Sequence, residues 1–195
     1  MTKSFAGLDW YGRTFEGEHF TECSFTDVDF TEARTRGTVF EFCRFSNCRF
    51  NVSEHDASAF VACQFVRTSW FGATLSGCKL AGSTFVECVL RPLTVTGGQW
   101  DGVVLRCADL KRLTLVGVRL RDADLSEADL SEASLRECDL SLAAVRGTNL
   151  ANTDLRWSTV VGVDLASAQL HQTQLSVAGA VTLAESCGAL VDVNA

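Results

Sequence analysis

The sequence predicts an all-β fold, a quadrilateral β-helix in which the chain completes one square coil about every twenty residues. The first observation is a five-residue period, because every fifth residue from Phe5 to Leu175 is large and apolar except Thr35 and His55. The second is that an α-helix and a flat strand both fail to keep such residues on one face, since five residues turn a helix by about 500° and reverse the face of a strand. The third is a small residue two positions ahead of many fifth residues, as in ADLSEADLSEASLRECDL at 123–140. The backbone must therefore turn once per pentad and keep each fifth side chain, here called the central residue, pointing inward.

The repeat extends over most of the chain. Residues 1–175 of the 195 form one body of about eight or nine coils, which stack at about 4.8 Å into a rod roughly 40 Å long. Residues 176–195 depart from the period and form a C-terminal helix and tail. We therefore expect one elongated domain with a separate terminal element.

The filling of the core changes along the rod. Phenylalanine dominates the central position in the first part, and Phe25, Phe45 and Phe65 are twenty residues apart, so they should stack in one column. Each buried ring contributes about 1.5–3 kcal/mol, with a further gain from ring contact. From Leu105 onward leucine takes over on the same plan, and this change requires no domain boundary.

The cysteines follow the same five-residue period. Of the nine cysteines, most lie two residues before a central residue, namely Cys23, Cys43, Cys48, Cys63, Cys78, Cys88 and Cys138. This is the position that alanine fills elsewhere, so we expect cysteine to act there as a small buried apolar residue with a free thiol. No CxxC pair is present, and the sequence predicts no metal site.

The two polar exceptions share a column because they are twenty residues apart. If Thr35 and His55 both point inward, they can share a hydrogen bond that offsets the cost of burying them. The alternative is an irregular turn at this side of the coil, in which both side chains face solvent. A catalytic or metal-binding histidine is disfavoured because the other histidines lie in outward positions.

Pro92 lies between the phenylalanine-rich and the leucine-rich parts of the repeat. It is the only proline, within CVLRPLTV at 88–95, and it cannot donate a ladder hydrogen bond. We expect a local kink or altered turn there, since the period resumes at Val95.

The tail shows helical spacing in place of the five-residue period. Ser176 can serve as N-cap and Gly188 as the C′ residue, and Leu190 is placed for the apolar contact that often follows. Two roles are open for this helix, a cap on the last coil or a two-fold dimer interface. The residues expected to form such an interface are Val177, Ala180, Val181, Ala184, Cys187 and Leu190.

Composition excludes several classes of function. The formal net charge of −7 argues against direct binding of nucleic acid, which needs a basic patch. No stretch is long and apolar enough to span a membrane, and no signal peptide is visible, so we expect a cytoplasmic protein. No phosphate loop, nucleophile motif or isolated carboxylate pair is present, and we expect no enzyme, no catalytic residue and no cofactor.

Most of the acidic residues occupy two outward positions, one just before the central residue and one two residues after it. Residues 122–139 hold seven acids against Arg136 alone and predict a negative belt around one coil, whereas four arginines make a basic interval at 34–49. Asp9, Asp29, Asp109 and Asp129 share one column. The acids expected to contact a partner are Asp29, Glu32, Asp109, Asp122, Asp124, Glu127, Asp129, Glu132, Glu137 and Asp139.

The pattern A-(D/N)-L-x-x, with phenylalanine allowed for leucine, resembles the pentapeptide-repeat family over roughly residues 5–175. The resemblance implies a right-handed quadrilateral β-helix. The segment CVLRPLTV and the apolar tail are similar to those of the fluoroquinolone-resistance members of that family, which are rod-shaped dimers joined at their C-terminal ends.

That similarity implies a homodimer that mimics B-form DNA, binds DNA gyrase, a topoisomerase, inhibits or modulates its supercoiling, and protects it from fluoroquinolones. The alternative is a non-catalytic repeat scaffold that binds another basic protein.

Overall fold

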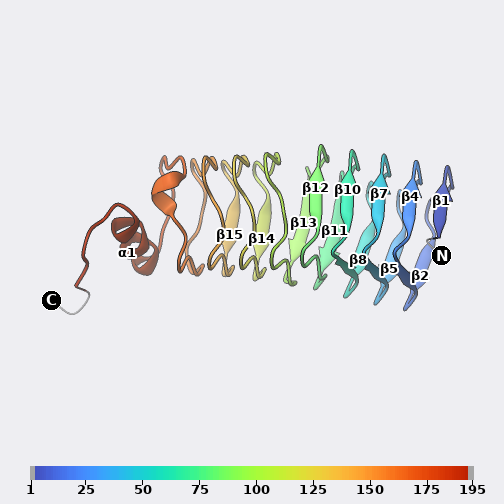
Figure 1. Cartoon of the computed structure of the whole chain (residues 1–195), viewed down its shortest axis with the longest axis horizontal. Coiled ribbons are helices and arrows are strands. Elements are labelled where there is room, and N and C mark those ends of the chain that lie inside the picture. The colour runs from blue at the N-terminus through green and yellow to red at the C-terminus, as the bar shows by residue number, and fades with distance from the viewer. Residues whose placement is uncertain (1–2, 193–195) are drawn as a thin grey trace.

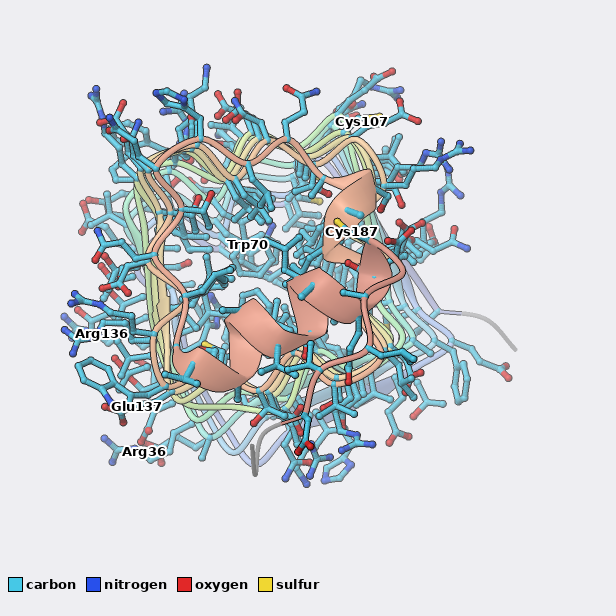
Figure 2. All side chains as sticks on the ribbon, turned by 90° about the vertical axis from the view of Figure 1, so that its left-hand side faces the viewer. Arg36, Trp70, Cys107, Arg136, Glu137 and Cys187 are labelled. Carbon is cyan, nitrogen blue, oxygen red and sulfur yellow. The ribbon has the colours of Figure 1, made fainter. Side chains whose placement is uncertain are left out.

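The structure is a computed structural model in which residues 3–192 are described, and it is a rod of stacked square coils (Figure 1). Parallel pairing joins residues twenty apart, as in Phe5 with Phe25 and Phe25 with Phe45. The same register continues into the leucine-rich part, where Asp124 pairs with Ala144. The predicted quadrilateral parallel β-helix is therefore confirmed, and viewed along its axis it has a square outline with Trp70 inside and charged side chains outside (Figure 2).

The coil has four walls, which we number in chain order from the wall of Phe5. Wall 1 is a five-stranded sheet in the order β1 (Ser4–Ala6), β4 (Ser24–Thr26), β7 (Arg44–Ser46), β10 (Gln64–Val66), β12 (Thr84–Val86). Wall 3 is a seven-stranded sheet in the order β2 (Thr14–Glu16), β5 (Arg34–Arg36), β8 (Glu54–Asp56), β11 (Ala73–Ser76), β13 (Leu93–Thr96), β14 (Thr114–Val116), β15 (Ser134–Arg136). Wall 4 begins as the sheet β3 (His19–Thr21), β6 (Val39–Glu41), β9 (Ala59–Val61). Wall 2, which carries Trp10 and Phe30, is joined by isolated bridges such as Asp9 with Asp29.

The corners explain the preference for glycine two residues after the central residue. The backbone there has positive φ, as at Gly37 (57°) and Gly117 (65°), and glycine accepts this conformation without steric strain. Acidic residues also occupy it, including Glu132 with φ of 60°. Side chains at the corners project outward because the backbone turns there.

The core is a set of stacked columns. On wall 1, the rings of Phe25 and Phe45 lie 4.7 Å apart with an interplanar angle of 5°, and those of Phe45 and Phe65 lie 4.9 Å apart. Neighbouring columns meet edge to face, as Phe25 does with Phe30 at 5.8 Å. The central residues from Leu105 to Leu165 are also buried, so the predicted change of filling occurs within one continuous core.

Pentads take two forms that differ in how the central carbonyl is paired. In the turn form, the N–H three residues later donates to it, as Ala33 N does to Phe30 O at 3.0 Å. In the extended form no such turn exists, and in many pentads a side chain 23 residues later donates to the central carbonyl, as Thr38 Oγ1 does to Phe15 O at 3.1 Å. Both bonds satisfy a buried carbonyl that the ladder leaves without a partner.

The difference separates cysteine from alanine, which the sequence pattern treats as equivalent. Each of the seven cysteines at this position follows an extended pentad, whereas the alanines follow turn pentads. The thiols donate to central carbonyls, as Cys43 Sγ does to Phe20 O at 3.3 Å and Cys138 Sγ to Leu115 O at 3.4 Å. Cysteine is therefore a weak hydrogen-bond donor here as well as a small apolar side chain.

Thr35 and His55 are both buried, as the first sequence alternative predicts. His55 Nδ1 lies 2.8 Å from Thr35 Oγ1, and Nε2 lies 2.9 Å from Ser53 Oγ. Thr35 also donates to Ser58 Oγ at 2.7 Å. Complete burial lowers the pKa of His55 to about 3, so the imidazole is neutral at physiological pH.

The C-terminal end carries η1 (Leu165–Ser167) and the helix α1 (Val177–Ser186), which lies across the last coil (Figures 1 and 2). Ser176 is the N-cap, and its side chain accepts from Gly179 N at 3.2 Å. Gly188 has φ of 88° and donates to Glu185 O at 2.8 Å, as predicted for the C′ residue. The apolar contact predicted for Leu190 is wrong, because that side chain is fully exposed.

Two further features complete the fold. The Arg91–Pro92 peptide bond is cis, and Gly72 N donates to Pro92 O at 2.7 Å where the regular register would place residue 91. The turn is thus locally altered as expected, while pairing of Ala73 with Leu93 keeps the twenty-residue register. Over residues 3–192, no helix combines the length and apolarity needed to cross a bilayer.

Candidate partner-binding surface

Aspartates just before the central residue have a local structural role. Asp29 Oδ1 accepts from Thr31 N at 2.9 Å, and Asp129 Oδ1 accepts from Ser131 N at 3.0 Å. This bond spans the central residue and fixes the turn, which explains why Asp and Asn are frequent there. One carboxylate oxygen makes this bond, and the other faces outward and pairs with a base, Arg49 at Asp29 and Lys111 at Asp129.

The acids predicted to contact a partner do not share one face. Asp29, Asp109 and Asp129 lie in the column of wall 2, with Glu32 and Glu132 at the corner that follows it. The remaining predicted acids lie on walls 1 and 4 or at other corners, and these are Asp122, Asp124, Glu127, Glu137 and Asp139. Figure 2 shows Glu137 at the corner beside Arg136 and Arg36 of wall 3. Wall 2 is therefore the face on which the predicted acids gather.

Basic side chains of a neighbouring coil pair with six of these ten carboxylates, and in five of the six pairs the base lies in the preceding coil. On wall 2, Asp109 pairs with Arg91, and Lys111 Nζ lies 3.1 Å from Asp129 Oδ2. At the next corner, Arg112 Nε lies 2.9 Å from Glu132 Oε2. Further pairs join Arg49 to Asp29, Arg106 to Glu127 and Arg121 to Asp139.

These pairs revise the predicted negative belt at 122–139. In the sequence the belt has no nearby bases except Arg136, because the bases that pair with its acids lie 18 to 21 residues earlier, in the preceding coil. Within the described part of the chain, Asp122, Asp124 and Glu137 are the belt acids that form no ion pair. The basic interval at 34–49 is compensated in the same way, since Arg34 pairs with Glu54.

The ion pairs keep the carboxylates charged. The hydrogen bond from Arg49 lowers the pKa of Asp29 to about 2. The hydrogen bonds from Arg106 and Arg112 lower the pKa values of Glu127 and Glu132 respectively. For Asp129, partial burial raises the pKa, but hydrogen bonds from Ser131 and Lys111 outweigh it and lower the pKa. These acids are therefore anionic at any physiological pH.

The N-terminal coils hold the least compensated acids. Among residues 3–192, Asp9, Glu16, Glu22, Asp27 and Glu32 form no ion pair. Glu32 accepts a hydrogen bond from Tyr11, which raises the pKa of that phenol. Acids without an ion pair are therefore numerous at this end of the rod, and only Glu32 of this group belongs to the predicted partner-binding set.

The face of α1 that packs on the last coil is offset from the predicted apolar stripe. Gly179 is buried and Leu183 packs against the core, while Ser186 Oγ accepts from Ala166 N at 3.2 Å. Of the predicted stripe, Val177 is 84% exposed and Ala180 is also exposed. Cys187 is exposed at the end of the helix, facing the viewer in Figure 2. Val181 and Ala184 of the stripe are partly buried, so the helix covers the coil with a face that overlaps the stripe and leaves Val177, Ala180 and Cys187 exposed.

Inside the coils formed by the described residues, there is no room for a substrate. The voids along the axis have volumes of about 10 Å³ and are lined by aromatic and leucine side chains. No group of three or more His, Cys, Asp and Glu side chains in residues 3–192 is arranged to hold a metal ion. Burial raises the pKa of the Cys78 and Cys138 thiols to about 11, so these thiols are poor nucleophiles.

Comparison with known proteins agrees with this geometry. A family model described as pentapeptide repeats matches residues 19–51, 104–141 and 138–176. The pentapeptide repeat protein MfpA of Mycobacterium tuberculosis (strain ATCC 25618 / H37Rv) is 38% identical over 96 residues, a match that spans 49% of this chain and 42% of MfpA.

Solved structures share the fold. A trypsin-treated variant of QnrB1, a plasmid-mediated fluoroquinolone resistance protein, superposes with a TM-score of 0.53 at 21% identity, covering 98% of this chain and 99% of that one. Full-length QnrB1 gives a TM-score of 0.50 at 22% identity, covering 95% and 100% of the two chains.

Proposed function

The chain belongs to the pentapeptide-repeat family, and from this premise we propose that it binds DNA gyrase as a protein mimic of duplex DNA. In doing so it inhibits or modulates supercoiling and protects gyrase from fluoroquinolones. The observation that carries the proposal is the column of anionic aspartates on wall 2, in a rod 38% identical over 96 residues to MfpA. The proposed action is non-catalytic and takes place in the cytoplasm.

The shape and chemistry of wall 2 support this role. Coils at about 4.8 Å place carboxylates in straight rows on a rigid rod, as a nucleic-acid backbone places its phosphates. The pairing bases reduce the local charge of each row, so the mimicry is of a partly neutralised duplex. A basic protein groove can compete with Arg91 and Lys111 for Asp109 and Asp129, since exposed ion pairs are weak.

The test is a supercoiling assay with purified gyrase and increasing amounts of the protein. We expect inhibition at micromolar concentrations or below, and increased resistance of supercoiling to a fluoroquinolone. Gyrase that supercoils normally and remains fully drug-sensitive at tens of micromolar protein contradicts the proposal. Retention of a different basic protein under those conditions favours the scaffold alternative.

A charge-reversal pair localises the contact. Asp129→Lys on wall 2 should weaken gyrase binding, because it places a cation where the basic partner docks. Asp154→Lys is the matched control, since Asp154 occupies the same pentad position on wall 3 and also caps a turn, at Arg156 N. Equal loss in both variants assigns the effect to net charge and removes wall 2 as the specific contact face.

We further propose that residues 176–195 serve as both cap and dimer interface, with residues 1–175 as the repeat body. The support is the exposed apolar face formed by Val177, Ala180, Leu190 and their neighbours. A two-fold axis through this face doubles the length of the rod. Val177→Asp should yield a monomer by sedimentation, whereas Val161→Asp, at a comparably exposed valine of wall 4, should leave a dimer; a dimer in both places the interface elsewhere.

A further inference from the structure

The stack of coils opens on wall 2 near the middle of the rod, between β12 and β14 in Figure 1. Elsewhere on this wall the central N–H donates to the carbonyl 19 residues later, as Trp70 N does to Val89 O at 2.8 Å. In the next coil the corresponding bond from Leu90 N to Asp109 O does not form among the described residues. The bonds expected from Glu87 N to Arg106 O and from Asp109 N to Cys88 O are also missing there.

The opening is confined to one wall and one level. Wall 1 keeps the bond from Phe85 N to Val104 O at 3.0 Å, and wall 3 keeps the pairing of Val95 with Leu115. One coil later the wall 2 ladder resumes, with Leu110 N donating to Asp129 O at 2.8 Å. The opening is therefore a local seam that leaves peptide N–H and C=O groups free.

Two hollows flank the seam on the surface. One has a volume of about 520 Å³ and is lined by Phe85, Val86, Leu90 and Cys107 among others. The second has a volume of about 350 Å³ and is lined by basic side chains including Arg91. The Arg91–Asp109 ion pair crosses the seam between the two.

Apolar side chains are exposed beside the seam. Val86 and Val89 are each about half exposed, at 49% and 51%. Two acids, Glu87 and Asp109, line the larger hollow, and within the described residues Glu87 forms no ion pair, whereas Asp109 pairs with Arg91. The larger hollow therefore combines apolar side chains with open backbone groups and two carboxylates.

We propose that this seam receives an apolar side chain, with the extended backbone that carries it, from a loop of the basic protein partner. The side chain fills the hollow beside Leu90, and its peptide groups pair with those that the ladder leaves free. A basic residue beside that side chain meets Glu87 and competes with Arg91 for Asp109, which is the charge complementarity that selects this occupant. The inference rests on the proposed function and deepens it, because a DNA duplex offers no such hollow and the contact fixes the register of the mimic on its partner.

The experiment compares Val89→Arg with Val161→Arg, measuring affinity for purified gyrase. Val161 is the matched control because it is an exposed valine, at 64%, on wall 4. We expect Val89→Arg to weaken binding about tenfold and Val161→Arg to change it less than about twofold. Equal effects of the two variants, or none, overturn the seam contact while wild-type binding still upholds the proposed function. Failure of wild-type protein to bind gyrase overturns both.

A footprint gives a second readout that does not depend on substitution at the seam. In a Cys187→Ser background, Cys107 is the exposed thiol, and Figure 2 shows it at an outer corner of the coil. Bound gyrase should slow its alkylation by iodoacetamide at least about fivefold, because the hollow is then filled. Alkylation at an unchanged rate in the complex overturns the proposal.

Discussion

The phenylalanine-rich and leucine-rich halves of the rod share one register but close their coils differently. In the first half, walls 1, 3 and 4 are extended strands and wall 2 is made of turns. In the second half, walls 1 and 4 also change to turns, as at Leu105 and Leu120, and only wall 3 keeps strands through β15. The comparison teaches that the inward side chain sets the register, while the same register accepts both extended and turn pentads, which differ in whether the central carbonyl is paired within its own turn.

The largest expected effect tests the stacked columns of the first half. Phe45→Ala should lower the free energy of unfolding by about 3–5 kcal/mol, because it removes a fully buried ring stacked on two others. Leu125→Ala, on the same wall in the second half, should cost about 2–5 kcal/mol and toward the lower end, since no ring stacking is lost. Urea denaturation measures both, and a larger loss for Leu125→Ala contradicts the proposed role of stacking.

The second test concerns the stability of the fold at low pH, because a buried titratable central residue is present only in the first half of the described chain. Burial lowers the pKa of His55 to about 3, against about 6.5 when unfolded, so the unfolded chain binds a proton at pH values between these. Stability should therefore fall by about 1.4 kcal/mol per pH unit below pH 6.5 and be constant above it. His55→Gln keeps hydrogen-bonding groups without titrating, and its stability should be flat between pH 6.5 and 5.

A pH dependence shared equally by wild type and His55→Gln assigns the acid sensitivity to other groups. Measurement above pH 5 keeps the carboxylate contribution small, since ordinary carboxyl pKa values of about 3.9 for Asp and 4.3 for Glu lie below this range. Thermal unfolding at several pH values supplies the measurement.

The third test compares the two ways of pairing a central carbonyl. Thr38→Val removes the side-chain donor to Phe15 O in an extended pentad, and should cost about 1–3 kcal/mol. Thr148→Val removes the donor to Leu125 O in a turn pentad, where Ala128 N still donates at 3.0 Å. Its effect on the free energy of unfolding should be less than half as large, and equal losses would falsify the distinction between the two forms.

The smallest effect is expected at the surface of the second half. Lys111→Ala breaks the pair with Asp129 and should change the free energy of unfolding by less than about 1 kcal/mol. If the carboxylate is a partner contact, freeing it should strengthen gyrase binding at low salt. If the Lys111→Ala variant binds gyrase more weakly instead, the lysine itself is part of the contact.

Much of the fold follows from the sequence because one period controls it. The column of Leu125 and the contact between Thr35 and His55 depend only on spacings of five and twenty residues, and the structure confirms both. The pairing of Arg91 with Asp109 was missed because it joins positions 18 apart, an offset that requires the pitch of the wall.

Two other features needed the coordinates. Which face of α1 meets the last coil depends on where that coil ends, so the sequence stripe missed Gly179 and Leu183 as the packing residues. The separate roles of Cys43 and Ala33 depend on whether a turn bond exists beneath them. A search for cysteine, serine or threonine 23 residues after a central residue could have found the hydrogen-bonding role of Cys43.

The twenty-residue register also bears on how such a chain changes length over generations. Because each coil meets its neighbours through the same positions, as Phe25 meets both Phe5 and Phe45, an in-frame duplication of one coil inserts a rung that both neighbours already fit. Gains or losses of other sizes rotate everything downstream onto a different wall. Lineages of this protein should therefore differ in length mainly by whole rungs, with smaller changes confined to the corners.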